Sequence, residues 1–240
     1  MNQLKTPSGI NYLEDFKSND LPTVIYFSGA GERNNYGDFT AMKRTSFYTK
    51  FYTTFKDQYN FFIPLQTLNS YSWVYPFVNG VAYGVGFIRW VKEKYGIDKV
   101  VLCSHSMGSG YSTAPLMPNE LSALVVSAGN GDYKQVIALA KTLLPVMQWH
   151  GKGDYSQNSF INGEKAMNWY KGAGGPVDWH PIEGGHGIDS IVYSPTSGVK
   201  EWIDKLFPIV DPVKPGLYVD GVWIGETSGT FENHLIEYKQ

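Results

Sequence analysis

The sequence is poor in cysteine and in long apolar runs. Its 240 residues include one cysteine, Cys103, which excludes an intramolecular disulfide and fits a reducing compartment. No segment approaches the roughly 20 consecutive apolar residues that a membrane-spanning helix needs, so we expect no association with a membrane. The first residues, MNQLKTPSGINYLEDF, lack the apolar centre of a signal peptide, which favours a cytoplasmic location.

An excess of charge of either sign is also lacking. The 20 lysines and arginines nearly balance the 22 aspartates and glutamates, for a net charge of −2, and the basic residues form no stripe. A nucleic-acid partner is therefore not expected. The histidines show no HExxH motif or other tight ligand spacing, so the sequence indicates no metal site.

Short apolar runs alternate along the chain with stretches compatible with helices. The runs, each expected to form a strand, are TVIYF (23–27), YNFFIPL (59–65), KVVLCS (99–104), LSALVVSAG (121–129), PVMQWHG (145–151) and PVDWHPIEG (176–184). The expected helices cover residues 47–55, 80–95, 132–144, 158–171 and 196–206. This alternation predicts the α/β class, with a mostly parallel sheet and helices on both faces. Ligands of such sheets bind beyond the carboxyl ends of the strands.

The character of the sequence changes after Leu206. The segment FPIVDPVKPG contains three prolines, and Asp220-Gly221 between two alternating runs is a hairpin signal. We therefore predict a catalytic domain over residues 1–208 and a β-rich C-terminal appendage over residues 209–240. The appendage is too short to have a core of its own.

The segment VVLCSHSMGSGYS (100–112) passes from an expected strand into a cluster of small polar residues. Within it, SHSMG (104–108) approximates the G-x-S-x-G pattern of a nucleophile elbow, with Ser106 at the tip and serine in place of the first glycine. An elbow places a serine at a sharp turn between a strand and a helix, where its hydroxyl is accessible. By itself, the pattern fits a serine-rich turn that caps a helix equally well.

The order of the possible catalytic partners favours the elbow. Asp154 lies in HGKGD after one expected strand and His186 lies in EGGHG after the next, which gives the order Ser, Asp, His of hydrolases that use this elbow. Asp132, in SAGNGD, is an alternative to Asp154 as the acid. We expect His105 to pack beside the elbow and His150 to shape the turn before Asp154.

The loop after the first expected strand, in YFSGAGE, is made of small residues that leave backbone N–H groups exposed. We expect the N–H groups of Ala30 and Met107 to face the oxyanion that forms when a serine attacks a carbonyl. Taken alone, the loop fits an ordinary glycine turn.

These residues resemble the α/β-hydrolase family, and within it the esterases and predicted peptidases related to feruloyl esterases, polyhydroxybutyrate depolymerases and dienelactone hydrolase. The resemblance covers roughly residues 22–207 and is carried by SGAGER (28–33), SHSMG, HGKGD and GGHG (184–187). It implies an α/β-hydrolase fold without a cofactor. It also implies Ser106 as nucleophile, His186 as base, Asp154 as orienting acid, and Ala30 and Met107 as oxyanion donors. The chain departs from the family at Ser28, where histidine is usual, and at Ser104, where glycine is usual.

Two features bear on the substrate. Between Gly129 and Pro145 the chain has room for about one helix and none for a cap domain, so the cleft is expected to be open. Tyr71, Trp73 and Tyr75 follow an expected strand and are candidates for stacking on a sugar or an aromatic acyl group.

The sequence therefore predicts a serine hydrolase that cleaves carboxylic esters through an acyl-enzyme. The expected substrate is a small-molecule or polymeric ester of a bulky or carbohydrate-linked group. A serine peptidase of the same fold and a non-catalytic binding or scaffold protein are the alternatives.

Overall fold

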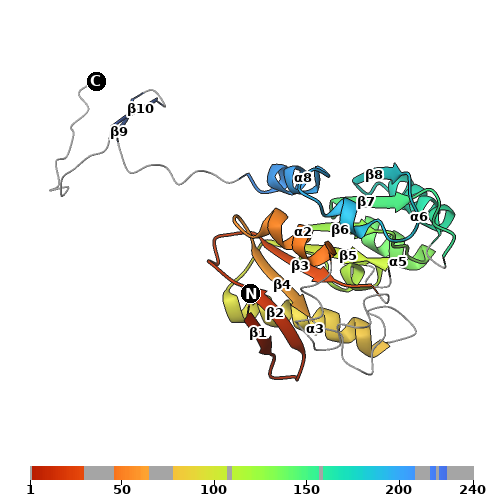
Figure 1. Ribbon diagram of the computed structural model, residues 1–240, viewed down its shortest axis with the longest axis horizontal. Helices are drawn as coiled ribbons and strands as arrows, with labels where there is room; N and C mark the ends of the chain where they lie inside the picture. The colour runs from red at the N-terminus through yellow and green to blue at the C-terminus, as the bar shows by residue number, and fades with distance from the viewer. Residues whose placement is uncertain are drawn as a thin grey trace. The chain divides into compact units, whose positions relative to one another are not determined.

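The computed structural model describes residues 2–29, 46–64, 78–106, 110–156, 159–208, 217–219 and 222–225. The chain divides into a large compact unit, Met1–Ile203, and a C-terminal unit, Asp204–Gln240. In chain order, the elements drawn in Figure 1 are β1 (Asn2–Lys5), β2 (Asn11–Asp15), β3 (Thr23–Phe27), α2 (Ser46–Phe55), β4 (Asn60–Pro64), α3 (Val78–Tyr95), β5 (Val100–His105), α4 (Gly110–Thr113), η3 (Ala114–Leu116), β6 (Ala123–Ser127), α5 (Tyr133–Ala140), β7 (Val146–Gly151), α6 (Phe160–Gly172), β8 (Val177–Ile182), α7 (Asp189–Val192), α8 (Val199–Leu206), β9 (Leu217–Val219) and β10 (Val222–Gly225).

The large unit is built on a sheet with the strand order β1-β2-β4-β3-β5-β6-β7-β8. The strands from β4 to β8 in this order pair in parallel, whereas β1 and β2 pair antiparallel with their neighbours. The predicted α/β class with a mostly parallel sheet is confirmed. Because the parallel strands share one direction, the loops after β5, β7 and β8 leave the sheet at the same edge.

Helices cover both faces of the sheet because its strands are apolar on both sides. All six residues of β5 are buried. On one face, Ile88 of α3 and Leu139 of α5 belong to the main core cluster. On the other, the ring of Phe51 in α2 lies 4.9 Å from the ring of Tyr26 and 4.7 Å from that of Tyr193, measured between centroids. Burial of this apolar surface is the main contribution to the stability of the fold.

The antiparallel strands β1 and β2 are not among the strands that the sequence predicts. All four residues of β1 are exposed, so β1 lacks the apolar alternation that identifies a half-buried strand. Tertiary contacts place β2 instead: Leu13 pairs with Ile63 of β4, and the ring of Tyr12 lies 5.1 Å from that of Trp90 in α3.

The connection between β6 and β7 is short and described throughout. It contains α5 and turns, with no inserted cap domain, as the sequence predicts. The edge of the sheet above β6 is therefore not covered from this connection.

In the C-terminal unit, β9 and β10 pair antiparallel, which confirms the hairpin signal at residues 220–221. The domain boundary at residue 208 stays a prediction.

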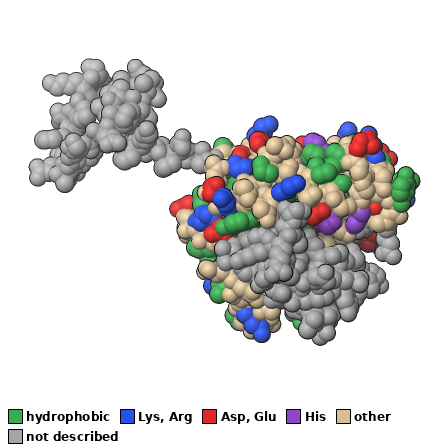
Figure 2. All heavy atoms as spheres, viewed as in Figure 1, with side chains coloured by type: hydrophobic (Ala, Val, Ile, Leu, Met, Phe, Trp, Pro, Cys, Tyr) green, Lys and Arg blue, Asp and Glu red, His purple; other side chains and the backbone are tan. Residues whose placement is uncertain are grey.

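On the face of the molecule shown in Figure 2, acidic, basic and hydrophobic side chains are interspersed among the coloured residues. No helix in the described ranges is long and apolar enough to cross a membrane.

Candidate active site

Ser106 lies immediately beyond β5 in a strained backbone conformation. Its φ is 51°, in the left-handed region that residues with a Cβ rarely adopt. Gly29, in the loop after β3, packs against this turn, because a Cβ on Gly29 would lie 3.0 Å from Ser106 Cβ and 2.9 Å from His105 Cδ2. Strand β5 thus ends at His105, directly before Ser106, and α4 begins at Gly110, which is the order of strand and helix around a nucleophile elbow.

Ser104 replaces the first glycine of the elbow pattern, and the structure accommodates it. The side chain is fully buried, and its Oγ accepts a hydrogen bond of 3.1 Å from the backbone N–H of Gly110 at the start of α4. The Tyr193 hydroxyl accepts from the Ser104 N–H at 3.1 Å and donates to the Ser104 carbonyl at 2.8 Å. The Ser104 hydroxyl therefore ties the end of the strand to the helix that follows.

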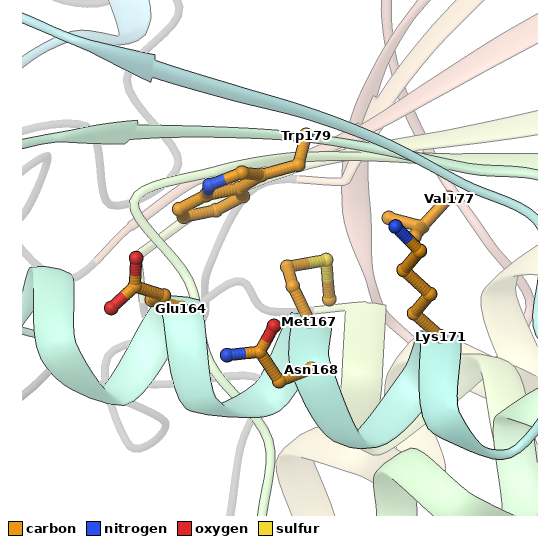
Figure 3. Close-up of a pocket in the computed structure, with 6 residues that line it drawn as sticks. All are labelled: Glu164, Met167, Asn168, Lys171, Val177 and Trp179. Atoms are coloured by element: carbon orange, nitrogen blue, oxygen red, sulfur yellow. The ribbon is translucent and has the colours of Figure 1, made fainter.

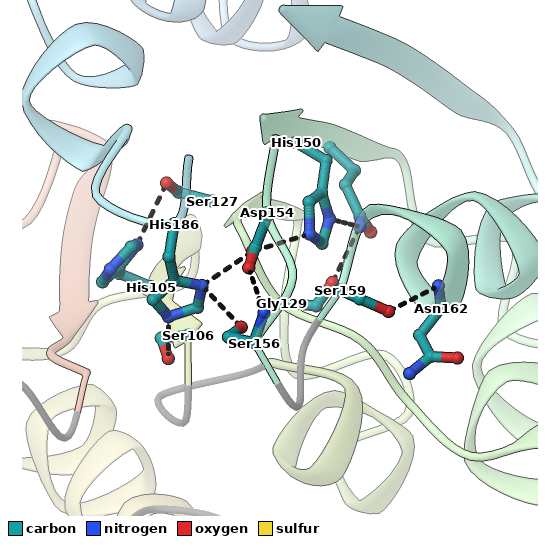
Figure 4. A network of polar contacts seen from close by, with 11 residues as sticks. His105, Ser106, Ser127, Gly129, His150, Asp154, Ser156, Ser159, Asn162 and His186 are labelled. Atoms are coloured by element: carbon teal, nitrogen blue, oxygen red, sulfur yellow. Dashed lines mark hydrogen bonds and ion pairs between the residues drawn. The ribbon is translucent and has the colours of Figure 1, made fainter. Parts of the chain in front are cut away.

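A chain of short hydrogen bonds joins three of the predicted site residues (Figure 4). Ser106 Oγ lies 2.7 Å from His186 Nε2, and His186 Nδ1 lies 2.7 Å from Asp154 Oδ2. The imidazole of His186 is about one-third exposed, at 33%, whereas the Asp154 side chain is fully buried. A neutral His186 with its proton on Nδ1 donates to Asp154 and accepts from the Ser106 hydroxyl.

The Asp154 carboxylate is held by several donors. Oδ1 accepts a hydrogen bond of 2.9 Å from the Ser156 N–H, and Oδ2 lies 3.1 Å from His150 Nε2 as well as close to His186. Burial raises the pKa of the Asp154 carboxyl, but the hydrogen bonds from His186 and Ser156 lower it by more, so this pKa lies below its ordinary value. The site therefore holds Asp154 as a carboxylate.

Glycines allow the loops after β7 and β8 to touch. A Cβ on Gly151 would lie 2.3 Å from the Gly185 carbonyl oxygen and 2.6 Å from that of Gly184. The Gly153 N–H donates a 2.8 Å hydrogen bond to the Gly184 carbonyl, and Gly184 itself has a φ of 129°. This backbone contact brings the loop of Asp154 against the loop of His186.

Ser156 is a site residue that the sequence analysis missed. Its Oγ lies 3.1 Å from His186 Nδ1, so it is a second possible partner for the proton on that nitrogen. The signal in the sequence is its position two residues after Asp154. An aspartate side chain often accepts a hydrogen bond from the N–H two residues later, and this turn keeps Ser156 beside Asp154.

Asp132, the alternative acid, has a different function. It is the N-cap of α5: its carboxylate accepts from the Gln135 N–H at 2.9 Å, and the Gln135 side chain accepts from the Asp132 N–H at 3.1 Å. This reciprocal pair is a capping box. Asp132 therefore caps a helix, and the carboxylate that meets His186 is that of Asp154.

His105 packs beside the elbow, as expected. Its Nδ1 lies 3.1 Å from Ser127 Oγ, and its ring centroid lies 5.3 Å from that of His186. Burial lowers the pKa of His105 from 6.5 to about 4. Cys103, one of the core residues of β5, is fully buried, and burial raises the pKa of its thiol well above the ordinary value, so it is not poised as a nucleophile.

The sequence predicts only that His150 shapes the turn before Asp154. In the structure its Nε2 also lies 3.1 Å from the Asp154 carboxylate.

Five predicted residues lie outside the described part of the chain: Ala30, Met107, Tyr71, Trp73 and Tyr75. The described residues include no group of three or more histidine, cysteine, aspartate or glutamate side chains placed to hold a metal ion.

A separate hollow of about 280 Å³ lies between α6 and β8 (Figure 3). Its walls are formed by Glu164, Met167, Asn168, Lys171, Val177 and Trp179. The indole of Trp179 faces α6 across the hollow. Of the predicted site residues that the structure describes, Ser106, Asp154 and His186, none lines this hollow.

No protein-family model and no curated protein matches the sequence, whereas solved structures match its fold. A thermostable esterase is 21% identical with a TM-score of 0.65, over 86% of this chain and 62% of that chain. A ferulic acid esterase is 13% identical with a TM-score of 0.61, over 86% and 97%. An acylaminoacyl peptidase of Pyrococcus horikoshii is 12% identical with a TM-score of 0.56, over 86% and 40%. The chain thus spans less than two thirds of the first and third of these proteins. The likeness shows that it has the α/β-hydrolase fold.

Proposed function

We propose that this protein is a serine hydrolase that cleaves carboxylic esters, with Ser106, His186 and Asp154 as its catalytic triad. The observation that carries the proposal is the 2.7 Å contact between His186 Nε2 and the Oγ of a serine in a strained elbow. A backbone held in a sparsely populated conformation is found preferentially at functional sites, and here it presents a hydroxyl to an imidazole backed by a buried carboxylate.

The proposed reaction follows from this geometry. Ser106 Oγ bonds to the ester carbonyl carbon while its proton moves to His186 Nε2. His186 then donates this proton to the alcohol oxygen as the ester C–O bond breaks, which leaves the acyl group on Ser106. Water next gives a proton to His186 and attacks the acyl carbon, and Ser106 regains its proton as the carboxylic acid leaves. Asp154 stays ionised and holds the imidazole in the tautomer that keeps Nε2 free to accept.

The backbone N–H groups of Ala30 and Met107 are proposed as the donors to the oxyanion. Ala30 directly follows Gly29 in the sequence, and Met107 directly follows Ser106. The contact between Gly29 and Ser106 supports this assignment, because it brings the loop after β3 next to the nucleophile.

The proposed substrates are esters of bulky or carbohydrate-linked groups. The short connection between β6 and β7 supports an open cleft, since it adds no cap there. Tyr71, Trp73 and Tyr75 follow β4, whose carboxyl end lies at the catalytic edge, and supply rings for stacking. One of the solved structures with this fold is named a ferulic acid esterase, which agrees with an aromatic acyl group.

Peptide hydrolysis by the same residues is the rival function, and the likeness to an acylaminoacyl peptidase favours it. Comparing an ester and an amide of the same acyl group, such as the p-nitrophenyl ester and the p-nitroanilide of acetylalanine, distinguishes the two. Turnover of the anilide that depends on Ser106 would replace the esterase proposal with the peptidase, because the ester is the more reactive substrate for either enzyme.

The triad itself is tested with a fluorophosphonate probe. The parent protein should be labelled on Ser106, and Ser106→Ala should lose the label and lower kcat by about 10³-fold or more. Ser104→Ala is the matched control: it keeps the nucleophile, so labelling should persist even though the buried hydrogen bond to Gly110 is lost. Label or full ester hydrolysis in Ser106→Ala would contradict the proposal, and an unreactive parent protein would favour a scaffold.

A further inference from the structure

The acid of the proposed triad contacts two imidazoles. Asp154 Oδ2 lies 2.7 Å from His186 Nδ1 and 3.1 Å from His150 Nε2 (Figure 4). His150 is at the end of β7, four residues before Asp154, and its side chain is fully buried. The proposed reaction uses His186 and leaves His150 without a role.

The hydrogen bonds behind His150 determine which of its nitrogens carries the proton. The carbonyl of Gly129 only accepts, so the atom 2.8 Å from it is the Nε2 amide group of Gln148. The Tyr111 hydroxyl donates to Gln148 Oε1, which agrees with this orientation. The same Nε2 group lies 3.4 Å from His150 Nδ1, and because it is a donor, Nδ1 accepts. His150 is therefore a neutral imidazole whose proton is on Nε2 and points at Asp154.

The position of this imidazole is fixed by close packing. A Cβ on Gly163 of α6 would lie 2.2 Å from His150 Nδ1, so the helix approaches the ring as closely as only a glycine permits. On another side, the ring of Phe160 lies edge-on, 6.1 Å away between centroids. These two contacts hold the imidazole beside Asp154.

We propose that His150 is a positioning residue, which holds the Asp154 carboxylate against His186 by donating its Nε2–H to Oδ2. This inference rests on the proposed function. Its physical basis is competition for the proton on His186 Nδ1. Ser156 Oγ lies 3.1 Å from that nitrogen, whereas Asp154 Oδ2 lies 2.7 Å from it. If the carboxylate turns away, His186 donates to a neutral hydroxyl, which stabilises an imidazolium less than a carboxylate does.

The first test compares His150→Met with His150→Gln. Methionine fills the space without a donor, whereas the terminal amide nitrogen of glutamine takes the place of Nε2. His150→Met should lower kcat by about 10- to 100-fold, the effect of losing a hydrogen bond to a charged group, with little change in KM. His150→Gln should recover most of the loss. Equal kcat values in these two variants, or a parental kcat in His150→Met, would overturn the proposal.

A double-mutant cycle with Asp154→Asn separates positioning from general damage to the fold. If His150 acts through the carboxylate, then His150→Met should have little further effect when Asp154 is already asparagine. The same fold-loss in both backgrounds would overturn the proposal. Failure of the proposed function is distinguishable, because the parent would then be inactive or Ser106→Ala would keep the parental activity, whatever the His150 variants do.

Two glycines of α6 provide a second pair of variants. Gly163→Ala pushes on the imidazole of His150 and should lower kcat, whereas Gly172→Ala, at the end of the same helix, has nothing within 4 Å of its new Cβ and should behave like the parent. Equal kcat in the two variants would count against the proposal.

The parent protein gives a test that needs no variant to fold. In ¹⁵N-histidine spectra, His150 should show a protonated Nε2 and an unprotonated Nδ1, and the opposite tautomer would overturn the inference.

Discussion

The burial of His105 should make the protein less stable as the pH falls from about 6.5 to about 4. His105 ends β5, is 8% exposed, and has its Nδ1 3.1 Å from Ser127 Oγ. Burial is the largest influence on its pKa and lowers it from 6.5 to about 4. The neighbouring charges act in both directions, since Asp189 and Asp154 raise this pKa and His186 lowers it.

The size and sign of the effect follow from the two protonation equilibria. In the unfolded chain this imidazole binds a proton near pH 6.5, whereas in the native protein it does so only near pH 4. At about 1.4 kcal/mol for each pKa unit, the difference amounts to ~3 kcal/mol of the free energy of unfolding. Because the unfolded state binds more protons between these values, this free energy falls as the pH falls. The contribution is fully present above pH 6.5 and is lost by about pH 4.

Urea unfolding of the parent and of His105→Asn, followed by tryptophan fluorescence at several pH values, measures the effect. The asparagine amide keeps a polar atom facing Ser127, and comparing pH slopes cancels any packing that the variant loses at every pH. Between pH 7 and pH 4, the parent should lose about 3 kcal/mol more stability than the variant. The same pH dependence in both proteins would refute the reasoning. So would an NMR titration in which the native His105 ring protonates near pH 6.5.

Two further predictions concern the loops that carry the acid and the base. Asp154→Asn should lower kcat by about 10³- to 10⁴-fold, because an amide cannot hold His186 in the productive tautomer. Asp132→Asn should leave kcat unchanged, since asparagine caps a helix equally well. Steady-state kinetics with a p-nitrophenyl ester measures both variants, and reversed results would move the acid to Asp132. Gly151→Ala should lower the free energy of unfolding by roughly 1–3 kcal/mol and also lower kcat, because its Cβ would lie 2.3 Å from the Gly185 carbonyl oxygen. Urea unfolding and steady-state kinetics measure the two effects. A variant with parental stability would show that the loops are not in close contact.

Much of the fold could be predicted because its central strands are continuous apolar runs. The run KVVLCS corresponds to β5, all of whose residues are buried, and PVMQWHG corresponds to β7, which is likewise buried throughout. The order of Ser106, Asp154 and His186 along the chain was equally readable. In a parallel sheet, the loops after all the strands leave at one edge, so residues that follow different strands can be expected there together.

Other features depend on contacts between distant segments and leave little trace in the local sequence. The strand β1 is exposed along its whole length and is identified by its pairing with β2. The choice between Asp154 and Asp132 depends on which loop touches the loop of His186, and that contact is made by backbone atoms of glycines. The orientation of His150 depends on the Gly129 carbonyl in the loop after β6, which acts through the side chain of Gln148.

Tyr193 connects the strained backbone at Ser106 with the segment that carries His186. A residue in the left-handed region costs about 1–3 kcal/mol, and this cost must be offset by interactions around the turn. Three hydrogen bonds meet at Ser104: its N–H donates to the Tyr193 hydroxyl, its carbonyl accepts from that hydroxyl, and its Oγ accepts from the Gly110 N–H. At about 1 kcal/mol each they are of the size required. Tyr193 lies seven residues after His186, at the end of α7. The segment that carries His186 thus also binds the strand that leads to Ser106, and the two side chains meet at 2.7 Å between His186 Nε2 and Ser106 Oγ. In the proposed hydrolase, these contacts would hold Ser106 in place for attack although serine replaces the first glycine of the elbow pattern.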